Sequence, residues 1–586
     1  MEVTRIFDLL EQYTEKYPDQ EVAVAGKVNH EWVKYNIKDY IRQVNRISYA
    51  FLAKGVLPGD KIGIICANRP EWNFFDFAIM QIGAVSVPIY PNISETDYIH
   101  ILNHAEIEYI FVDSKDLVKR LQPILAKVPH FKEVICMQKA QNAITLEDFY
   151  KLGDEKSNPE EVQKRKEAVK ATDLATMIYT SGTTGLPKGV MLSHRNILSQ
   201  LEALKVTPAK WSNKVLSFLP LCHAYERILV YLYHYLGMSI YYAENLGTIA
   251  ENIKEVHPTM MSCVPRVLEK MYDKLYLAGK KMTGFKKALY YWAFNLAKEY
   301  KIDENTLWYR IRHIIADKLI YSKWREAIGG NFDIVVSGGA AIQKHQAAFF
   351  NAIGMPVFEG YGISETSPVI AVSARGKGNR IAGTVGPPLP GVEIRIVEND
   401  EIICRGPNVM MGYYKDPELT AEVIDKDGWF HTGDTGKFTE NGNLVITGRL
   451  KNIFKTSFGK YVNPFLIEEQ FCKSPFIEHM VVLGENEKYA AALIVPDFTY
   501  LKDFCTRHNI AYSDNETMVK DPEIIAIYKK ETNKFNPMFA HYEQIKNLEL
   551  IADEWTIDNN ILTPTLKVKR KEIQLRYKDQ IEKLFA

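Results

Sequence analysis

Cysteine is sparse in this chain of 586 residues. The seven cysteines are scattered singly, mostly within apolar runs, and no Cys-x-x-Cys pair occurs. This pattern excludes a zinc knuckle and argues against a disulfide framework. We therefore expect a protein of the reducing cytoplasm.

Long apolar runs and a surplus of charge are also absent. The longest aromatic and apolar stretch, 228–242, is interrupted by His234 and is shorter than the roughly 20 residues that span a bilayer. Residues 1–15 lack the basic and then apolar pattern of a signal peptide. The 72 basic and 72 acidic residues balance, so we expect no nucleic-acid partner.

The pattern of apolar residues changes twice along the chain. The first 170 residues alternate helical and strand-like segments, which is typical of an α/β protein. After residue 383, short strands alternate with turns rich in Pro, Gly and Asp and indicate a small distorted β-barrel or sheet. A smaller α/β unit follows a junction around Lys451. We expect an N-terminal domain over 1–450 and a C-terminal domain over 451–586.

The segment 180–189, Thr-Ser-Gly-Thr-Thr-Gly-Leu-Pro-Lys-Gly, lies between two apolar runs and is predicted to be a loop between strands. Its glycines allow close approach of the backbone to a ligand, and its hydroxyl groups and Lys188 suit a polyphosphate. A Walker loop would need Gly-Lys-Ser/Thr at the start of a helix, which Pro187 and the following strand-like run exclude. A solvated surface turn has the same composition and stays open at this point.

Four further motifs follow this loop in order. They are Phe-Glu-Gly-Tyr-Gly-Ile-Ser-Glu-Thr at 358–366, Trp-Phe-His-Thr-Gly-Asp at 429–434, Gly-Arg-Leu-Lys-Asn at 448–452 and Pro-Thr-Leu-Lys at 564–567. Together with 179–190 they resemble the motifs of the adenylate-forming superfamily, which includes acyl-CoA synthetases, luciferases and the adenylation domains of peptide synthetases. Ser364 replaces a threonine and keeps its hydroxyl. Asn452 replaces an aspartate, so a hinge salt bridge from that position is in doubt.

The resemblance implies an α/β fold in which mixed sheets sandwich helices, with a small distorted β-barrel and a mobile C-terminal domain. It also implies a site for ATP and magnesium. The implied phosphate ligands are Thr180, Ser181, Gly182, Thr183, Thr184, Gly185, Lys188 and, at the α-phosphate, Ser364. Magnesium would be held by Glu365 and Thr183. The implied adenine slot comprises Gly338, Gly339, Ala340, Glu359, Gly360, Tyr361 and Gly362, and the ribose would contact Asp434 and Arg449.

Each of these residues has a plainer explanation when taken alone. Glu365 could be a helix-start carboxylate, Asp434 a turn former and Tyr361 a packed aromatic residue. Their order along the chain, together with the phosphate loop, favours the ATP site.

Three strings resemble long-chain fatty-acid CoA ligases more specifically. They are 219–227 around His223, 264–270, and 562–570, in which Leu566 replaces the glycine of the wider superfamily. In those ligases this histidine borders the acyl site. A structural histidine with satisfied hydrogen bonds is the alternative.

The resemblance implies ATP-dependent activation of a long-chain fatty acid to acyl-CoA through acyl-AMP, with ATP, Mg²⁺ and coenzyme A required. Members of the family rotate the C-terminal domain between the two half-reactions, so Lys567 would serve adenylation and the strip 449–460, with Lys455, thioester formation. A fatty acyl-AMP ligase that transfers to a carrier protein stays open. So does a catalytically silent binding protein, although intact Lys188, Glu365 and Lys567 argue against it.

Lysines and aromatic residues are interspersed over 270–301. They predict either an amphipathic helix at the membrane surface or a solvated helix face over an aromatic core. Peripheral contact with the inner face of the membrane is compatible with both, because fatty acids are poorly soluble. Acyl-chain preference and oligomeric state stay open, with a homodimer as one alternative.

Overall fold

The computed structural model describes residues 2–180, 186–206, 213–330, 332–556, 559–563 and 567–586. Its first eight-stranded sheet has the order β18-β9-β8-β4-β3-β5-β6-β7. The strands are β3 (Lys61–Ile65), β4 (Val85–Pro88), β5 (Tyr109–Val112), β6 (Glu133–Cys136), β7 (Ile144–Thr145), β8 (Leu174–Thr180), β9 (Lys188–Ser193) and β18 (Gly412–Tyr413). Strands β3 to β8 pair in parallel, as the predicted alternation requires, whereas β9 turns back antiparallel to β8.

The second eight-stranded sheet has the order β15-β14-β13-β12-β10-β11-β1-β2. Its strands are β1 (Val24–Val28), β2 (Glu31–Tyr35), β10 (Lys214–Ser217), β11 (Ser239–Tyr242), β12 (Met260–Cys263), β13 (Ile334–Ser337), β14 (Val357–Gly362) and β15 (Val369–Val372). The helices of these two sheets are α1 (Asp8–Lys16), α2 (Ile37–Ala53), α3 (Pro70–Gln81), α4 (Glu95–His104), α5 (Lys115–Leu125), α6 (Leu146–Glu155), α7 (Pro159–Ala168), α8 (His194–Ala203), α9 (Ala224–Tyr235), α10 (Ile249–Val256) and α15 (Lys344–Ala352).

Helices α3 and α9 lie between the two sheets. Every residue of α3 is buried, and one hydrophobic core joins it to α9 and to strands of both sheets. A helix that is buried on all sides belongs in such an interior, and its few polar side chains need partners there. Asp76 of α3 forms a buried ion pair with Arg227 of α9 and accepts a hydrogen bond from Ser86 Oγ at 2.6 Å. This pair fixes α9, and with it His223 at the start of the helix.

The predicted small β-unit is an antiparallel four-stranded sheet in the order β16-β17-β19-β20. It contains β16 (Glu393–Ile396), β17 (Glu401–Arg405), β19 (Phe430–Phe438) and β20 (Leu444–Arg449), with α16 (Pro417–Val423) nearby. The α/β class and the small sheet are therefore confirmed.

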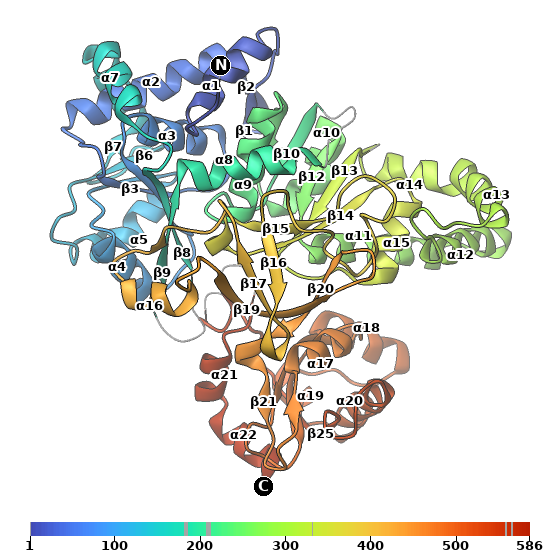
Figure 1. The fold of residues 1–586 in the computed structure, drawn as a ribbon. Coiled ribbons are helices and arrows are strands. Elements are labelled where there is room, and N and C mark those ends of the chain that lie inside the picture. The colour runs from blue at the N-terminus through green and yellow to red at the C-terminus, as the bar shows by residue number, and fades with distance from the viewer. Residues whose placement is uncertain (1, 181–185, 207–212, 331, 557–558, 564–566) are drawn as a thin grey trace.

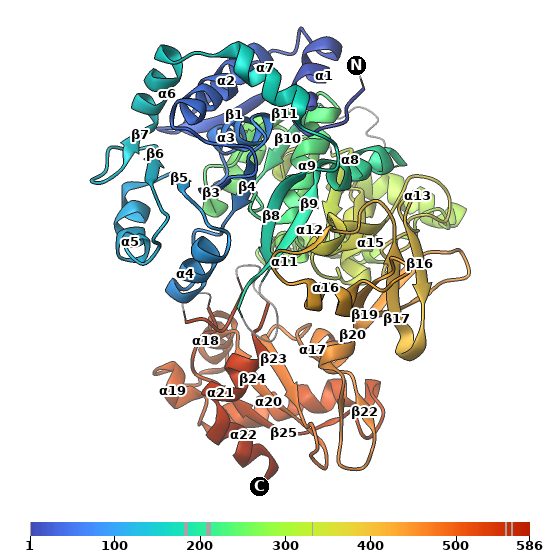
Figure 2. The same cartoon turned by 60° about the vertical axis from the view of Figure 1, so that its left-hand side comes forward.

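Residues after 450 form a smaller unit, drawn in orange and red in Figure 1. Its elements are β21 (Phe454–Lys455), β22 (Tyr461–Val462), α17 (Pro464–Phe471), β23 (Ile477–Leu483), β24 (Ala490–Pro496), α18 (Phe498–His508), α19 (Asn515–Met518), α20 (Pro522–Phe535), β25 (Ile545–Leu550), α21 (Arg570–Arg576) and α22 (Lys578–Phe585). Its buried apolar residues form cores of their own. Figure 2 shows this unit below the two large sheets.

Residues 265–327 form a series of short helices. These are α11 (Pro265–Lys280), α12 (Gly284–Lys298), α13 (Leu307–Ala316), the π-helical turn η3 (Asp317–Tyr321) and α14 (Ser322–Ala327). Tyr290 and Phe294 are buried while Lys286 and Lys287 are exposed, so this part of 270–301 has a solvated face over an aromatic core, although Phe285 and Tyr276 are exposed too. Among the described residues, no helix is long and apolar enough to cross a membrane.

Candidate functional site

The predicted phosphate loop connects two antiparallel strands, as the sequence indicates. Thr180 ends β8 and pairs with Lys188 at the start of β9. The Lys188 Nζ lies 5.4 Å from the centroid of the Tyr413 ring. The predicted phosphate ligands Ser181, Gly182, Thr183, Thr184 and Gly185 fall outside the described residues.

Glu365 lies beside the same tyrosine. The Tyr413 hydroxyl donates a hydrogen bond to Glu365 Oε1 at 2.9 Å. Tyr413 belongs to β18, which pairs with β9. There Tyr413 lies opposite Val190, two residues after Lys188. Strand pairing therefore brings the predicted magnesium ligand and the predicted phosphate lysine onto one aromatic ring, and the adjacent Ser364 is buried.

The small number of carboxylates at the site suits a magnesium ion that is bound together with a nucleotide. No cluster of three or more His, Cys, Asp or Glu side chains capable of holding a metal occurs in the described part of the chain. Mg²⁺ commonly uses one or two carboxylates, substrate phosphates and water rather than a protein cage. Glu365 supplies such a carboxylate, and Tyr413 fixes its orientation.

The predicted adenine residues lie at the carboxyl ends of neighbouring strands of the second sheet, because β13 and β14 pair in parallel with Ser337 opposite Glu359. Beyond β13, a Cβ at Gly338 would lie 3.0 Å from the Tyr225 ring, and Gly339 has φ +82°. Both positions therefore favour glycine. Burial raises the pKa of Glu359 to about 8, even though its carboxyl group accepts backbone hydrogen bonds from Gly383 and Ile342. Ala340, Gly360 and Gly362 extend the same edge.

The buried Asp434 joins three strands at the predicted ribose position. Its Oδ1 forms an ion pair with Arg449 Nε at 2.8 Å, and its Oδ2 accepts a hydrogen bond from the Tyr361 hydroxyl at 2.7 Å. Asp434 and Arg449 are register partners on β19 and β20. Each carboxylate oxygen retains a lone pair with which it could accept a ribose hydroxyl.

Lys567, from the C-terminal unit, is electrostatically coupled to residues of the N-terminal part. The surrounding protein lowers the pKa of Lys567, and the positive charge of Arg449 lowers it further, whereas Asp434 and Glu365 oppose this shift. Lys567 nevertheless keeps an exposed face, so its ammonium can exchange protons with solvent. The predicted ribose and magnesium residues therefore act electrostatically on the predicted adenylation lysine.

His223 belongs to the same constellation. It caps the N-terminus of α9, where its Nδ1 accepts a hydrogen bond from the Tyr225 backbone N–H at 3.1 Å. Burial, and then the positive charge of Lys567, lower the pKa of His223 to about 4. The ring is thus neutral at pH 7 and carries its proton on Nε2, where it can donate a hydrogen bond.

Lys455 is not brought to this constellation. It is exposed on β21, with its Nζ 5.5 Å from the Tyr461 ring centroid, and it does not contribute to the pKa shift of Lys567. The structure therefore presents Lys567 rather than Lys455 to the predicted ATP residues.

Sequence reasoning missed two histidines that hold the ends of the phosphate loop. On α4, His104 Nδ1 is 2.8 Å from the Tyr179 hydroxyl, and His100 Nε2 donates to the Pro187 carbonyl oxygen at 2.9 Å. The two imidazole rings are stacked, with centroids 5.2 Å apart. Their four-residue spacing places them on one helix face, but nothing in the sequence links that face to the loop.

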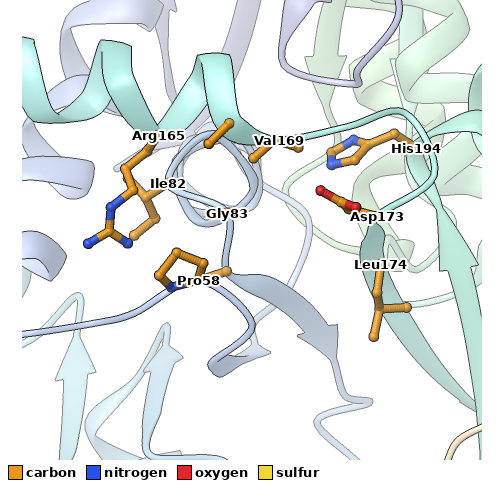
Figure 3. A pocket seen from close by; sticks show the side chains of 10 residues that line it. Pro58, Ile82, Gly83, Arg165, Val169, Asp173, Leu174 and His194 are labelled. Carbon is orange, nitrogen blue, oxygen red and sulfur yellow. The ribbon is translucent and has the colours of Figure 1, made fainter.

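A small internal cavity of about 90 Å³ lies elsewhere in the N-terminal part (Figure 3). Asp173 accepts the Lys170 backbone N–H, and His194 Nδ1 accepts that of Ile6. Arg165 Nε donates to Glu161, whereas Arg165 Nη1 is buried without a hydrogen-bond partner among the residues that the structure describes. None of the ten lining residues, all within the described ranges, is a predicted site residue. The cavity is therefore a packing space between elements.

A glycine-rich loop between strands, a carboxylate beside it and a lysine from a separate C-terminal unit define the class of adenylate-forming enzymes. The model of the AMP-binding enzyme family matches residues 10–414, and that of its C-terminal domain matches 452–586. The chain belongs to this family, within its branch of long-chain fatty-acid CoA ligases.

Several relatives support this assignment. The chain is 32% identical to fatty acyl-CoA synthetase A of Dictyostelium discoideum, over 97% of this chain and 88% of that protein. It is 31% identical to long-chain-fatty-acid–CoA ligase FadD15 of Mycobacterium tuberculosis, over 94% and 92%. The A domain of a carboxylic acid reductase from Segniliparus rugosus, solved with AMP and a carboxylic acid, shares the fold with a TM-score of 0.74 at 20% identity, over 99% and 94%.

We predict that His104→Ala raises the KM for ATP by about tenfold, because the buried Tyr179 hydroxyl loses its partner, a change worth about 1–3 kcal/mol. Steady-state kinetics with varied ATP measure this, and His104→Gln should recover part of the loss. The exposed His541 provides the control, since His541→Ala should leave KM unchanged. An unaltered KM in His104→Ala would refute the role of this histidine as a positioning residue.

Proposed function

We propose that the protein activates long-chain fatty acids as CoA thioesters. In the first half-reaction, a carboxylate oxygen of the fatty acid bonds to the α-phosphorus of ATP while the bond to pyrophosphate breaks. In the second, the sulfur of coenzyme A bonds to the acyl carbon, and the carbon–oxygen bond to AMP breaks. The observation that carries this proposal is the coupling of Lys567 to Glu365, Asp434, Arg449 and His223.

The first half-reaction brings two anions together, so it depends on positioning and on positive charge. Lys188 and the loop would hold the β- and γ-phosphates, and Ser364 and Lys567 would contact the α-phosphate. Asp434 and Arg449 would hold the ribose. Glu365 would ligate magnesium, which neutralises phosphate charge when bound.

His223 would contribute as an uncharged donor at the acyl end of the site. Its neutral ring offers Nε2–H to a carboxylate oxygen without adding a charge. The similarity to fatty acyl-CoA synthetases and fatty-acid–CoA ligases favours coenzyme A as the acceptor over a carrier protein. The intact charged residues favour an enzyme over a silent binding protein.

The two parts of the chain would change their relative orientation between the half-reactions. Residues 1–450 and 451–586 would move as two separate bodies. A rotation would replace Lys567 at the ATP site by the strip that contains Lys455. We also propose that the enzyme works in the cytoplasm at the inner face of the membrane, where its substrates partition. A homodimer stays one possible assembly.

We predict turnover of palmitate and very poor turnover of acetate. Each buried CH₂ contributes about 0.8 kcal/mol of favourable transfer energy, so an apolar acyl site rewards a long chain. AMP release that depends on coenzyme A, measured over acids from acetate to oleate, tests this. Equal activity on acetate and palmitate would contradict the substrate class. Pyrophosphate release with accumulation of palmitoyl-AMP, and no AMP release when coenzyme A is added, would favour the carrier-protein alternative.

We predict that Lys567 and Lys455 serve different half-reactions. Lys567→Ala should slow pyrophosphate release from ATP and palmitate by about 10²–10³-fold, the usual loss for one preorganised donor, yet still convert synthetic palmitoyl-AMP and coenzyme A to the thioester. Lys455→Ala should do the reverse. Lys578, exposed on α22, supplies the control, because Lys578→Ala should leave both steps intact. Equal damage to both steps in each variant would overturn the proposed alternation.

The lowered pKa of Lys567 predicts an early alkaline limit for adenylation. The ammonium form is the active one, so the rate should fall as pH rises through a pKa below the usual 10.5 of lysine. In Lys567→Arg, the guanidinium stays charged and the alkaline limb should move to higher pH. Pyrophosphate release measured across pH tests this, and identical profiles in the two proteins would assign the limb to another group.

A further inference from the structure

An apolar stripe runs along the outer face of α13 and the following turn η3. Its members are Leu307, Trp308, Ile311, Ile314, Ile315 and Leu319, and all six are exposed. Leu307 is 76%, Trp308 68% and Ile314 67% accessible. Their spacing of three or four residues, with neighbouring pairs, places them along one side of the helix. We call this set the α13 stripe.

The opposite side of the helix is firmly attached to the protein. Tyr309 and Tyr321 are buried and donate hydrogen bonds to the backbone carbonyls of Leu296 and Ala293, both at 2.8 Å. His313 Nε2 donates to the Ala352 carbonyl oxygen at 2.7 Å. The helix is thus fixed with a second apolar face directed outward. Single exposed apolar residues are normal on a protein surface, whereas a contiguous patch marks an interaction site.

Positive charge surrounds the α13 stripe. Arg310, Lys318 and Lys323 are exposed, and none of them forms an ion pair with any other described residue. The acidic Asp317 is already paired with Arg325 at 2.5 Å. Within 307–325 the unpaired charges are therefore cationic, although the exposed Asp303, Glu304 and Glu326 flank this segment. This excess of positive charge along the helix suits an anionic surface rather than a neutral apolar partner.

The α13 stripe lies at the edge of the molecule. Figures 1 and 2 both show α13 at the periphery, away from α21, which follows Lys567 in the chain. A large flat partner could therefore contact the stripe without covering the residues around Lys567.

We propose that the α13 stripe docks the protein on an anionic phospholipid bilayer. Helix α13 lies in the plane of the interface, with its leucine and isoleucine side chains among the acyl chains and Trp308 at the headgroup level. Arg310, Lys318 and Lys323 contact anionic headgroups. The purpose of the contact rests on the proposed function, because fatty acids concentrate in bilayers; the contact itself does not depend on catalysis.

Binding to vesicles tests the proposal without any substrate. The full-length protein is mixed with vesicles of phosphatidylglycerol and phosphatidylcholine in equal parts, and the bound fraction is measured by flotation. The double variant Leu307→Glu with Ile314→Glu should bind at least about tenfold more weakly, since two side chains lose their apolar transfer energy. The control is Leu575→Glu on α21, which is also 76% exposed and should bind like the wild type. Equal binding of the double variant and the wild type would overturn the proposal.

The electrostatic part has its own measurement. Each of Arg310→Gln, Lys318→Gln and Lys323→Gln should weaken binding to the mixed vesicles by about fivefold, which corresponds to about 1 kcal/mol per cation. Added salt should weaken wild-type binding in the same direction. Binding of the wild type that is equally strong on pure phosphatidylcholine would contradict the role of these cations.

Trp308 allows a test that leaves the apolar character of the stripe intact. Brominated phosphatidylcholine in the mixed vesicles should quench part of the wild-type fluorescence, and Trp308→Phe should lose that part while still binding. If the stripe instead joins two copies of the chain, the Glu double variant would abolish a dimer in sedimentation experiments and no vesicle binding would be found, which overturns the proposal. Palmitate activation in detergent solution, measured separately, reports on the proposed function alone.

Discussion

The interaction on which the site depends is the electrostatic coupling of Lys567 to Asp434, Glu365 and Arg449. Lys567 belongs to the C-terminal unit, whereas the other three come from the second sheet and the small sheet. The site therefore exists only while the two parts of the chain hold this orientation. The pKa of His223 depends on this orientation, because the charge of Lys567 lowers it and would no longer do so if Lys567 moved away.

The contacts between the two parts are weak enough to be exchanged. Arg266 of α11 forms an ion pair with Glu478 of β23 at 2.9 Å, and both side chains are substantially exposed. Such surface pairs contribute about 0–1 kcal/mol. The turn at the junction is tightly built, since Asn463 Nδ2 donates to the Thr447 carbonyl oxygen and a Cβ at Gly448 would collide with the Asn463 side chain. The weak Arg266–Glu478 pair and the compact turn around Gly448 suit a rotation of the C-terminal unit about that turn.

The sequence predicted the parts of the site that are local, and missed those that arise from tertiary contacts. The strands flanking the phosphate loop and the small sheet followed from alternation and turn residues. The link from Tyr413 to Glu365 and the histidines at the loop ends needed strand pairing and helix packing that no local pattern encodes. The membrane hypothesis was placed on 270–301, where Tyr290 and Phe294 are core and Phe285 and Tyr276 are exposed. The exposed apolar face lies further on, in α13, because burial of a helix face is decided by its neighbours rather than by its own period.

The neutral state of His223 has a consequence for catalysis. A protonated histidine beside the fatty carboxylate would bind that anion strongly before it attacks the α-phosphorus. Stabilisation of the ground state in this way lowers KM without raising the rate of the chemical step. Burial, and then the charge of Lys567, lower the pKa of His223, so the ammonium that would stabilise charge on the pentavalent phosphorus adds to the neutrality that burial imposes on the histidine. Under the proposed rotation of the C-terminal unit, the charge of Lys567 would leave the site, and the carbonyl of the acyl-AMP would meet an environment with less positive charge as the thiol approaches.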